Sequence, residues 1–185
     1  VLVHPDCCKI LRATLDYFTE HGAVFYKKMA HVGYLRHLLV RRGVKTGEIL
    51  VDLVTSTQTE GTWKSEQNEE ALLEGWKEKL LELDLEGSFA GILHTENDSL
   101  ADVVQNDRTV ILYGQDFFME ELLGLKFKIT PFSFFQTNSL GAEVLYETAR
   151  EYIGETDGRK VFDLYSGTGT IAQILAPAAE HVTGV

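Results

Sequence analysis

The sequence predicts an α+β domain with a mainly antiparallel sheet, followed by the start of a doubly wound α/β domain. Two observations predict the first domain: helical and strand patterns follow one another over residues 1–130, and the arm Leu125–Thr130 alternates between apolar and polar side chains. A strand, a Gly-x-Gly turn and a helix succeed one another over Val161–Ala172, which predicts the second domain. We therefore divide the chain into domains 1–130 and 131–185.

The first domain contains two expected helices, over residues 6–20 and 65–84. In the first helix Cys7, Leu11 and Phe18 recur on one face with Ile10, Thr14 and Tyr17 beside them, and we expect this face to be buried. Strands are expected over residues 34–42, 48–55, 87–95, 109–113, 117–122 and 125–130. The first two strands are joined by a glycine-bounded loop, which predicts a hairpin.

The second domain opens with Pro131 and the loop Phe132–Asn138, in which aromatic side chains stand beside side-chain amides. Such a loop suits the wall of a site for a planar ligand, and equally a hydrophobic plug between domains. A helix capped by Asn138 or Ser139 follows. Its packing side is expected to carry Ala142, Leu145, Ala149 and either Tyr152 or Ile153.

Composition bounds the class of protein. Of the 185 residues 44% are apolar and 24% charged, and the net charge is −11, a profile typical of soluble globular proteins. No apolar run reaches the roughly 18 residues that a membrane span needs, so we expect no membrane association. The adjacent Cys7 and Cys8 lack a Cys-x-x-Cys partner, which favours helix packing over a disulfide or a metal site. A cytoplasmic location is expected.

A basic stretch interrupts this acidic chain. Residues 21–50 carry six lysines and arginines against Glu48 alone. Four of them form the candidate RNA-binding face: Arg36, Arg41, Arg42 and Lys45. Clustered cations can bind phosphates, but lysine and arginine also protect the edge of a sheet from pairing with other chains. Charge alone leaves both interpretations open.

The glycine turn is the strongest sign of a ligand. Gly167 and Gly169 lie between an apolar strand and a helix, where free backbone N–H groups can hold a charged cofactor. The spelling also fits the Gly-x-Gly-x-x-Ala pattern of dinucleotide-binding proteins. A nicotinamide- or flavin-dependent oxidoreductase therefore stays an alternative. A non-catalytic RNA-binding module, formed by the first domain, is a second one.

Three stretches together resemble the RNA uracil-5-methyltransferases: Gly33–Gly43, Phe132–Asn138 and Val161–Gly169. The resemblance implies a class I methyltransferase (Rossmann-like) domain that uses S-adenosylmethionine. The residues implied to contact the cofactor or to shape its turn are Gln136, Tyr165, Gly167, Gly169 and Thr170. The substrate implied is RNA, 23S rRNA rather than tRNA.

The same resemblance implies chemistry that lies outside this chain. Family members are thought to add a cysteine thiolate to C6 of uracil, so that C5 attacks the methyl group and a base then removes the C5 proton. That cysteine and base are expected beyond Val185, so no catalytic residue is expected within the span. The chain is interpreted as an inactive fragment without the N-terminal RNA-binding barrel and the C-terminal catalytic half. Any iron–sulfur cluster would have its ligands elsewhere, and the oligomeric state is not predicted.

Overall fold

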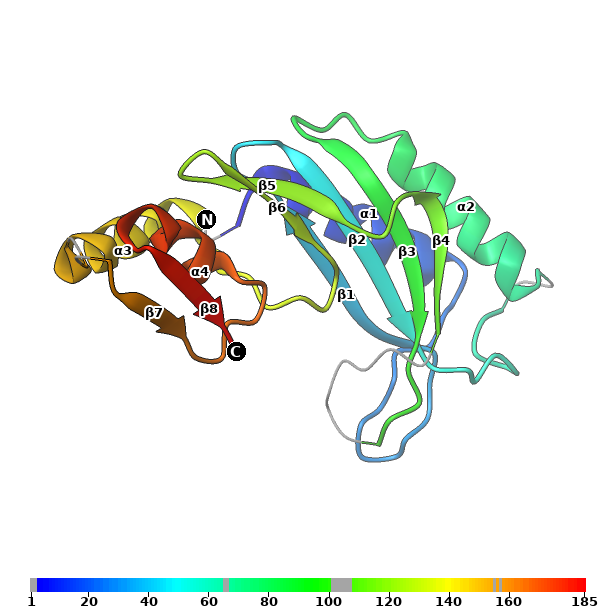
Figure 1. The fold of residues 1–185 in the computed structure, drawn as a ribbon. Coiled ribbons are helices and arrows are strands. Elements are labelled where there is room, and N and C mark those ends of the chain that lie inside the picture. The colour runs from blue at the N-terminus through cyan, green and yellow to red at the C-terminus, as the bar shows by residue number, and fades with distance from the viewer. Residues whose placement is uncertain (1–2, 65–66, 101–107, 155, 157) are drawn as a thin grey trace. The chain divides into compact units, whose positions relative to one another are not determined.

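The computed structural model, drawn in Figure 1, describes residues 3–64, 67–100, 108–154, 156 and 158–185. Its contacts divide the chain into two units. The first comprises Val1–Arg42 and Gly47–Phe118, and the second comprises Gly43–Thr46 and Met119–Val185. The sequence-based division at 130/131 differs from this one, because the hairpin that follows Phe118 groups with the α/β part of the chain.

The first unit is built on a four-stranded sheet. Its strands are β1 (Leu35–Arg42), β2 (Glu48–Thr55), β3 (Ser88–Glu96) and β4 (Arg108–Gly114), in that order across the sheet. The outer pairs are antiparallel and the central pair, β2 with β3, is parallel. The predicted mainly antiparallel sheet is confirmed. The parallel pair arises because a helical crossover returns the chain to the same end of the sheet.

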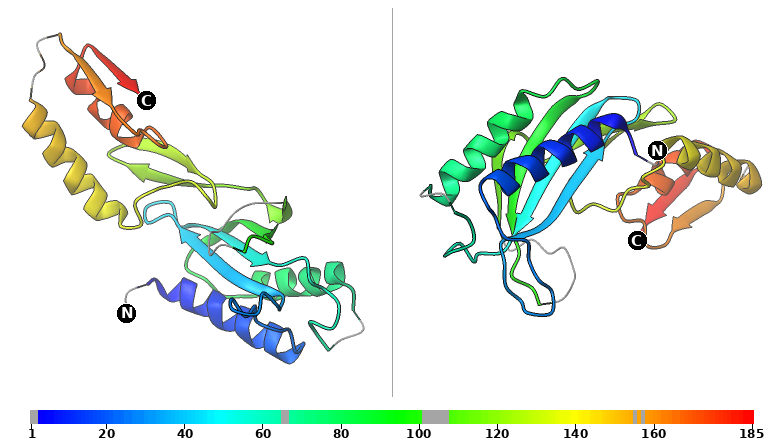
Figure 2. Two further views of the ribbon diagram at one scale, coloured as in Figure 1. Left: turned by 90° about the horizontal axis from the view of Figure 1, so that it is seen from below. Right: turned by 180° about the vertical axis from the view of Figure 1, so that it is seen from behind.

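Two helices, α1 (Pro5–Glu20) and α2 (Glu69–Leu81), cover one face of this sheet (Figure 2). The buried row of α1 is Asp6, Ile10, Thr14 and Phe18, one residue per turn. The predicted face is partly wrong: Ile10, Thr14 and Phe18 are buried, whereas Leu11 is 57% exposed. The indole nitrogen of Trp76 on α2 donates to the Thr14 hydroxyl (3.1 Å), which draws the Ile10–Thr14–Phe18 row inward.

The helix α2 is shorter than predicted. Asn68 ends the preceding loop and its side chain accepts a hydrogen bond from the Ala71 N–H (2.9 Å), so the helix begins at Glu69. Leu72, Trp76 and Leu80, which recur at helical spacing, are buried. Leu83 lies beyond the helix end, and residues 65–66 fall outside the described ranges.

The second unit contains a hairpin and a βαβ arrangement. Its elements are β5 (Phe118–Leu122), β6 (Leu125–Ile129), α3 (Ser139–Ile153), β7 (Lys160–Asp163), α4 (Thr170–Leu175), the 3₁₀ turn η1 (Ala176–Ala178) and β8 (His181–Gly184). Strands β7 and β8 are parallel, as a doubly wound fold requires. The face predicted for α3 is partly wrong: Ala142 and Tyr146 are buried, whereas Leu145 and Tyr152 are exposed.

The loop Gly43–Thr46 belongs to the second unit because two carboxylates hold it there. Glu120, only 1% exposed, accepts the N–H groups of Val44 (2.6 Å) and Lys45 (3.2 Å) and the hydroxyl of Ser139 (2.7 Å). The Lys45 ammonium pairs with Glu143, which also accepts the Leu123 N–H (2.7 Å). Buried carboxylates are tolerated when charged or polar donors satisfy them in this way.

Candidate functional site

The glycine turn has three residues in the left-handed backbone region. They are Tyr165 (φ 63°), Gly167 (φ 54°) and Gly169 (φ 71°). Glycine adopts this conformation readily, but a tyrosine there costs about 1–2 kcal/mol. Tyr165 is also 99% exposed, so both faces of its ring are open to solvent. A flat group of a ligand could stack on one of them.

Hydrogen bonds brace the turn from within the unit. The N–H of Ser166 donates to the Val185 carbonyl (3.0 Å), and the N–H of Gly169 donates to the Ser166 carbonyl (2.7 Å). Among the described residues, the N–H groups of Gly167 and Thr168 have no hydrogen-bond partner. Two adjacent free donors at a strand–helix turn fit a polar or anionic ligand group.

Asp163 fixes the turn to the helix that follows. Its side chain is 9% exposed and accepts the N–H of Ala172 (3.0 Å) in the first turn of α4. Thr170 is buried, with its hydroxyl 2.8 Å from that of Thr168. In the sequence, Asp163 stands out only as part of the Val161–Gly169 motif. A lone acid in an apolar strand was the signal for its bracing role.

The predicted cofactor contact Gln136 lies in the exposed loop between β6 and α3. In the same loop the Phe135 ring packs 6.0 Å from that of Phe127, while Phe134 is largely exposed. The structure thus brings Tyr165, Gly167, Gly169 and Thr170 together in one turn. No hydrogen bond among the described residues joins them to Gln136, whose role stays a prediction.

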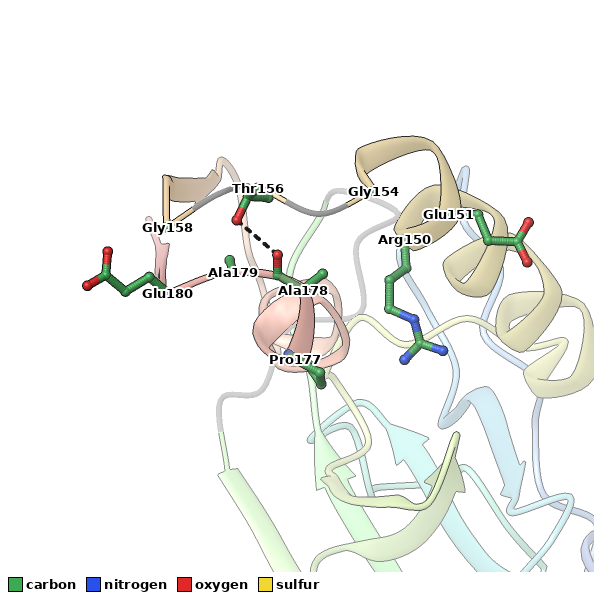
Figure 3. A pocket seen from close by; sticks show the side chains of 9 residues that line it. All are labelled: Arg150, Glu151, Gly154, Thr156, Gly158, Pro177, Ala178, Ala179 and Glu180. Carbon is green, nitrogen blue, oxygen red and sulfur yellow. Dashed lines mark hydrogen bonds between the residues drawn. The ribbon is translucent and has the colours of Figure 1, made fainter.

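A hollow of about 580 Å³ lies elsewhere in the second unit (Figure 3). It is lined by Arg150, Glu151, Gly154, Thr156, Gly158 and the segment Pro177–Glu180. Gly158 and Glu180 come just before β7 and β8, so the hollow lies at the amino ends of these strands. Ligands of open α/β sheets bind at the carboxyl ends, where the glycine turn lies. The hollow is therefore not the predicted cofactor site.

The four predicted RNA-binding residues are engaged within the fold. Arg36 donates to the carbonyls of Asn97 (2.5 Å) and Ser99 (2.9 Å). Arg42 lies 3.4 Å from the buried Asp6 carboxylate, and burial lowers the pKa of Arg41. Lys45 pairs with Glu143, so each of the four side chains is partly buried or interacts with other residues of the fold. Their contact with RNA stays a prediction.

Neither a metal site nor a strong nucleophile stands out in the described part of the chain. The residues described there include no group of three His, Cys, Asp or Glu side chains that could hold a metal ion. Burial and the neighbouring Asp6 raise the pKa of the Cys7 thiol, which disfavours the reactive thiolate. Within the same described ranges, no helix has the length and apolarity to cross a membrane.

An α+β unit is followed by a βαβ arrangement with a braced glycine turn, as predicted for a domain that precedes the beginning of a class I methyltransferase domain. Comparison with known proteins supports this. No protein-family model matches the chain. A protein of Clostridium tetani named an uncharacterized RNA methyltransferase is 51% identical over 184 residues, covering all of this chain and 38% of the relative. A namesake from Caldanaerobacter subterraneus is 44% identical, covering all of this chain and 39% of that protein.

A solved structure is similar as well. It is the tRNA (uracil-54, C5)-methyltransferase of Pyrococcus abyssi in complex with S-adenosyl-L-homocysteine. The TM-score is 0.67 at 27% identity, over 97% of this chain and 39% of that one. The chain is therefore similar over its whole length to proteins named RNA methyltransferases, in agreement with the resemblance of its motifs, and it spans about two fifths of the length of these relatives.

Proposed function

We propose that this chain forms part of a cytoplasmic enzyme that uses S-adenosylmethionine to methylate C5 of uracil in RNA, 23S rRNA rather than tRNA. The single observation that carries the proposal is the braced glycine turn, in a chain whose fold matches a tRNA (uracil-54, C5)-methyltransferase. The preference for rRNA rests on the sequence motifs, since the solved relative acts on tRNA.

The residues of the turn have distinct roles in this proposal. S-adenosylmethionine supplies the methyl group when bound. The free N–H groups of Gly167 and Thr168 donate to its polar atoms, and the exposed ring of Tyr165 lies against a flat face of it. Gln136, an uncharged amide with both donor and acceptor, binds its amino-acid end. The nucleophilic cysteine, the base and any iron–sulfur ligands belong to other parts of the protein.

The direct test incubates the protein at its natural length with methyl-labelled S-adenosylmethionine and either unmodified 23S rRNA or tRNA. We expect 5-methyluridine in the rRNA. Label in tRNA alone would reverse the choice of substrate. Binding of NAD in place of S-adenosylhomocysteine, with no transfer to either RNA, would favour the dinucleotide-dependent alternative.

The role of Gln136 is tested by Gln136→Ala in the same protein. Loss of one or two hydrogen bonds should weaken S-adenosylhomocysteine binding by about 1–3 kcal/mol, measured by titration calorimetry. Gln115→Ala, an amide of the first unit, is the matched control and should bind like the unsubstituted protein. An unchanged affinity in Gln136→Ala would remove this residue from the site.

The basic face is tested by charge reversal at Arg41 and Arg42. If both contact phosphates, RNA affinity falls and the slope of log affinity against log salt becomes shallower by about one per lost contact. Because Arg42 also pairs with Asp6, the melting temperature of each variant must be measured alongside. An unchanged salt slope returns these residues to the role of protecting a sheet edge.

A further inference from the structure

The segment between α1 and β1 contains an exposed loop, residues 25–33, which we call the finger. It forms part of the blue connection that extends beyond the end of the sheet in Figure 1. Three of its apolar side chains, Phe25, Met29 and Val32, are 56%, 97% and 55% exposed. Single exposed apolar residues are ordinary, but three in one short loop indicate a contact surface.

Backbone hydrogen bonds hold the finger in one conformation. The N–H of Lys27 donates to the Val32 carbonyl (2.8 Å), and the N–H of His31 donates back to the Lys27 carbonyl (2.8 Å). These two bonds close a turn around Met29. The exposed side chains of the finger therefore project from a hydrogen-bonded turn and not from an irregular loop.

The open end of the finger is clamped to the first unit. The Gln58 amide donates to the His31 carbonyl (2.9 Å) and accepts the Gly33 N–H (3.2 Å), while the Ser56 hydroxyl donates to the Gly33 carbonyl (2.6 Å). Gly33 has a φ of 126°, and a Cβ there would lie 2.5 Å from the Phe25 carbonyl oxygen. Closing this end requires glycine.

Arg36 supports the base of the finger. Its guanidinium carbon lies 4.3 Å from the centre of the Tyr26 ring, and its nitrogens donate to the carbonyls of Asn97 and Ser99. Arg36 therefore holds Tyr26, and with it the finger, against the segment that contains Asn97 and Ser99. A surface that is ordered before binding loses less conformational entropy when a partner arrives.

Charge indicates which partner the finger fits. Lys27 and Lys28 have exposed side chains, and no acidic residue occurs between Glu20 and Glu48 in a chain whose net charge is −11. Cations interleaved with an exposed aromatic ring are the combination that binds single-stranded nucleic acid, through phosphates and base faces respectively.

We propose that the finger is an RNA-binding surface, with Lys27 and Lys28 on phosphates and Phe25 and Met29 against bases of a single-stranded segment. This inference rests on the proposed function, because it names part of the RNA contact of the same enzyme. It assigns contact to residues outside the predicted set and gives Arg36 a positioning role.

The test uses the natural-length protein and a short fluorescent single-stranded RNA containing uridine, with anisotropy measured over a range of salt. In the double variant Lys27→Glu, Lys28→Glu the slope of log affinity against log salt should become shallower by about 1.4, since each lost phosphate contact to a single strand removes about 0.7. Phe25→Ala should weaken binding roughly tenfold, the loss of one stacked base. The variant Lys27→Arg, Lys28→Arg keeps the charge and should bind like the unsubstituted protein.

Matched controls are Lys126→Glu on β6 and Leu11→Ala on α1, both exposed positions outside the finger. If the finger variants bind RNA as these controls do, the inference is overturned while the proposed function stands. If the finger variants lost binding to another protein but still bound RNA as the controls do, the RNA-binding inference would be overturned as well. If the unsubstituted protein neither binds RNA nor transfers methyl, both fail. Melting temperatures of the same samples separate lost binding from lost folding.

Discussion

The two units differ in how many of their apolar side chains are buried. In the first unit β2 is buried at every position except Glu48, and Trp76 at the centre of α2 is fully buried. In the second unit β7 buries only Asp163, and Phe162 is exposed together with Leu145 and Tyr152 of α3. The first unit thus has the larger buried core, while the second unit buries fewer apolar side chains, among them Leu122, Ile129 and Ile174. The second presents apolar surface of the kind that ligands or partners cover.

The largest expected effect comes from truncating the core of the first unit. Trp76→Ala removes a fully buried side chain and the hydrogen bond to Thr14, so the free energy of unfolding should fall by about 3–5 kcal/mol. Tyr152→Ala, an exposed aromatic of the second unit, should change it by about 0.5 kcal/mol or less. Urea unfolding followed by circular dichroism measures both. Equal losses would erase the contrast between the units.

A second prediction concerns two buried groups on the sheet of the first unit. Burial raises the pKa of Asp52 to about 6 and lowers that of His94 to about 4, where the Arg108 charge also contributes. The imidazole lies 2.8 Å from the Thr55 hydroxyl and 4.0 Å from Glu69. Asp52 favours its protonated form in the folded state. Its contribution to the free energy of unfolding is therefore lost as the pH rises from about 4 to 6. His94 favours its neutral form in the folded state. Its contribution to the free energy of unfolding is therefore lost as the pH falls from about 6.5 to 4.

The two groups change the unfolding free energy with pH in opposite directions, so their effects largely cancel in the unsubstituted chain. Asp52→Asn should reveal the His94 slope, so that the unfolding free energy rises by about 3 kcal/mol between pH 4 and 6.5. Urea titrations at several pH values measure it, with the exposed Asp16→Asn as control. A variant whose pH profile matched the control would show that Asp52 ionises normally.

The smallest effect is expected in the second unit. Asp163→Ala removes the acceptor for the Ala172 N–H and should destabilise the turn by about 1 kcal/mol. Hydrogen exchange should become several-fold faster at the Ala172 amide and stay unchanged in α2. Faster exchange in both places would mean that the turn is not an independent local structure.

Local pattern predicted most elements but not their partners. The spans of α1, β1, β2 and the βαβ arrangement follow from periodicity and turn residues, and they are confirmed. The burial of Asp6 at the start of α1 could not be predicted, because its carboxylate accepts the N–H groups of Glu86 (3.0 Å) and Gly87 (2.9 Å), far along the chain. The parallel pairing of β2 with β3 is likewise a long-range property.

The candidate site divides in the same way. Adjacent residues such as Tyr165 and Gly167 could be placed together because a turn is local. The setting of Arg36 beneath Tyr26 could not, because its carbonyl acceptors lie on a segment about sixty residues away. The finger was missed because its lysines were counted within a larger basic stretch, with no sign that a closed turn exposes them.

The attachment of the loop Gly43–Thr46 has a consequence for dissecting the protein. The second unit is made of two separate stretches of chain, so no single cut yields it whole. A piece that began at Met119 would lack the Val44 and Lys45 donors, so that among the described residues the Glu120 carboxylate would keep the donors of Glu121 and Ser139 alone. Such a piece would be a poor sample for crystallisation or binding work. A graft of the loop or a circular permutation would supply the missing donors.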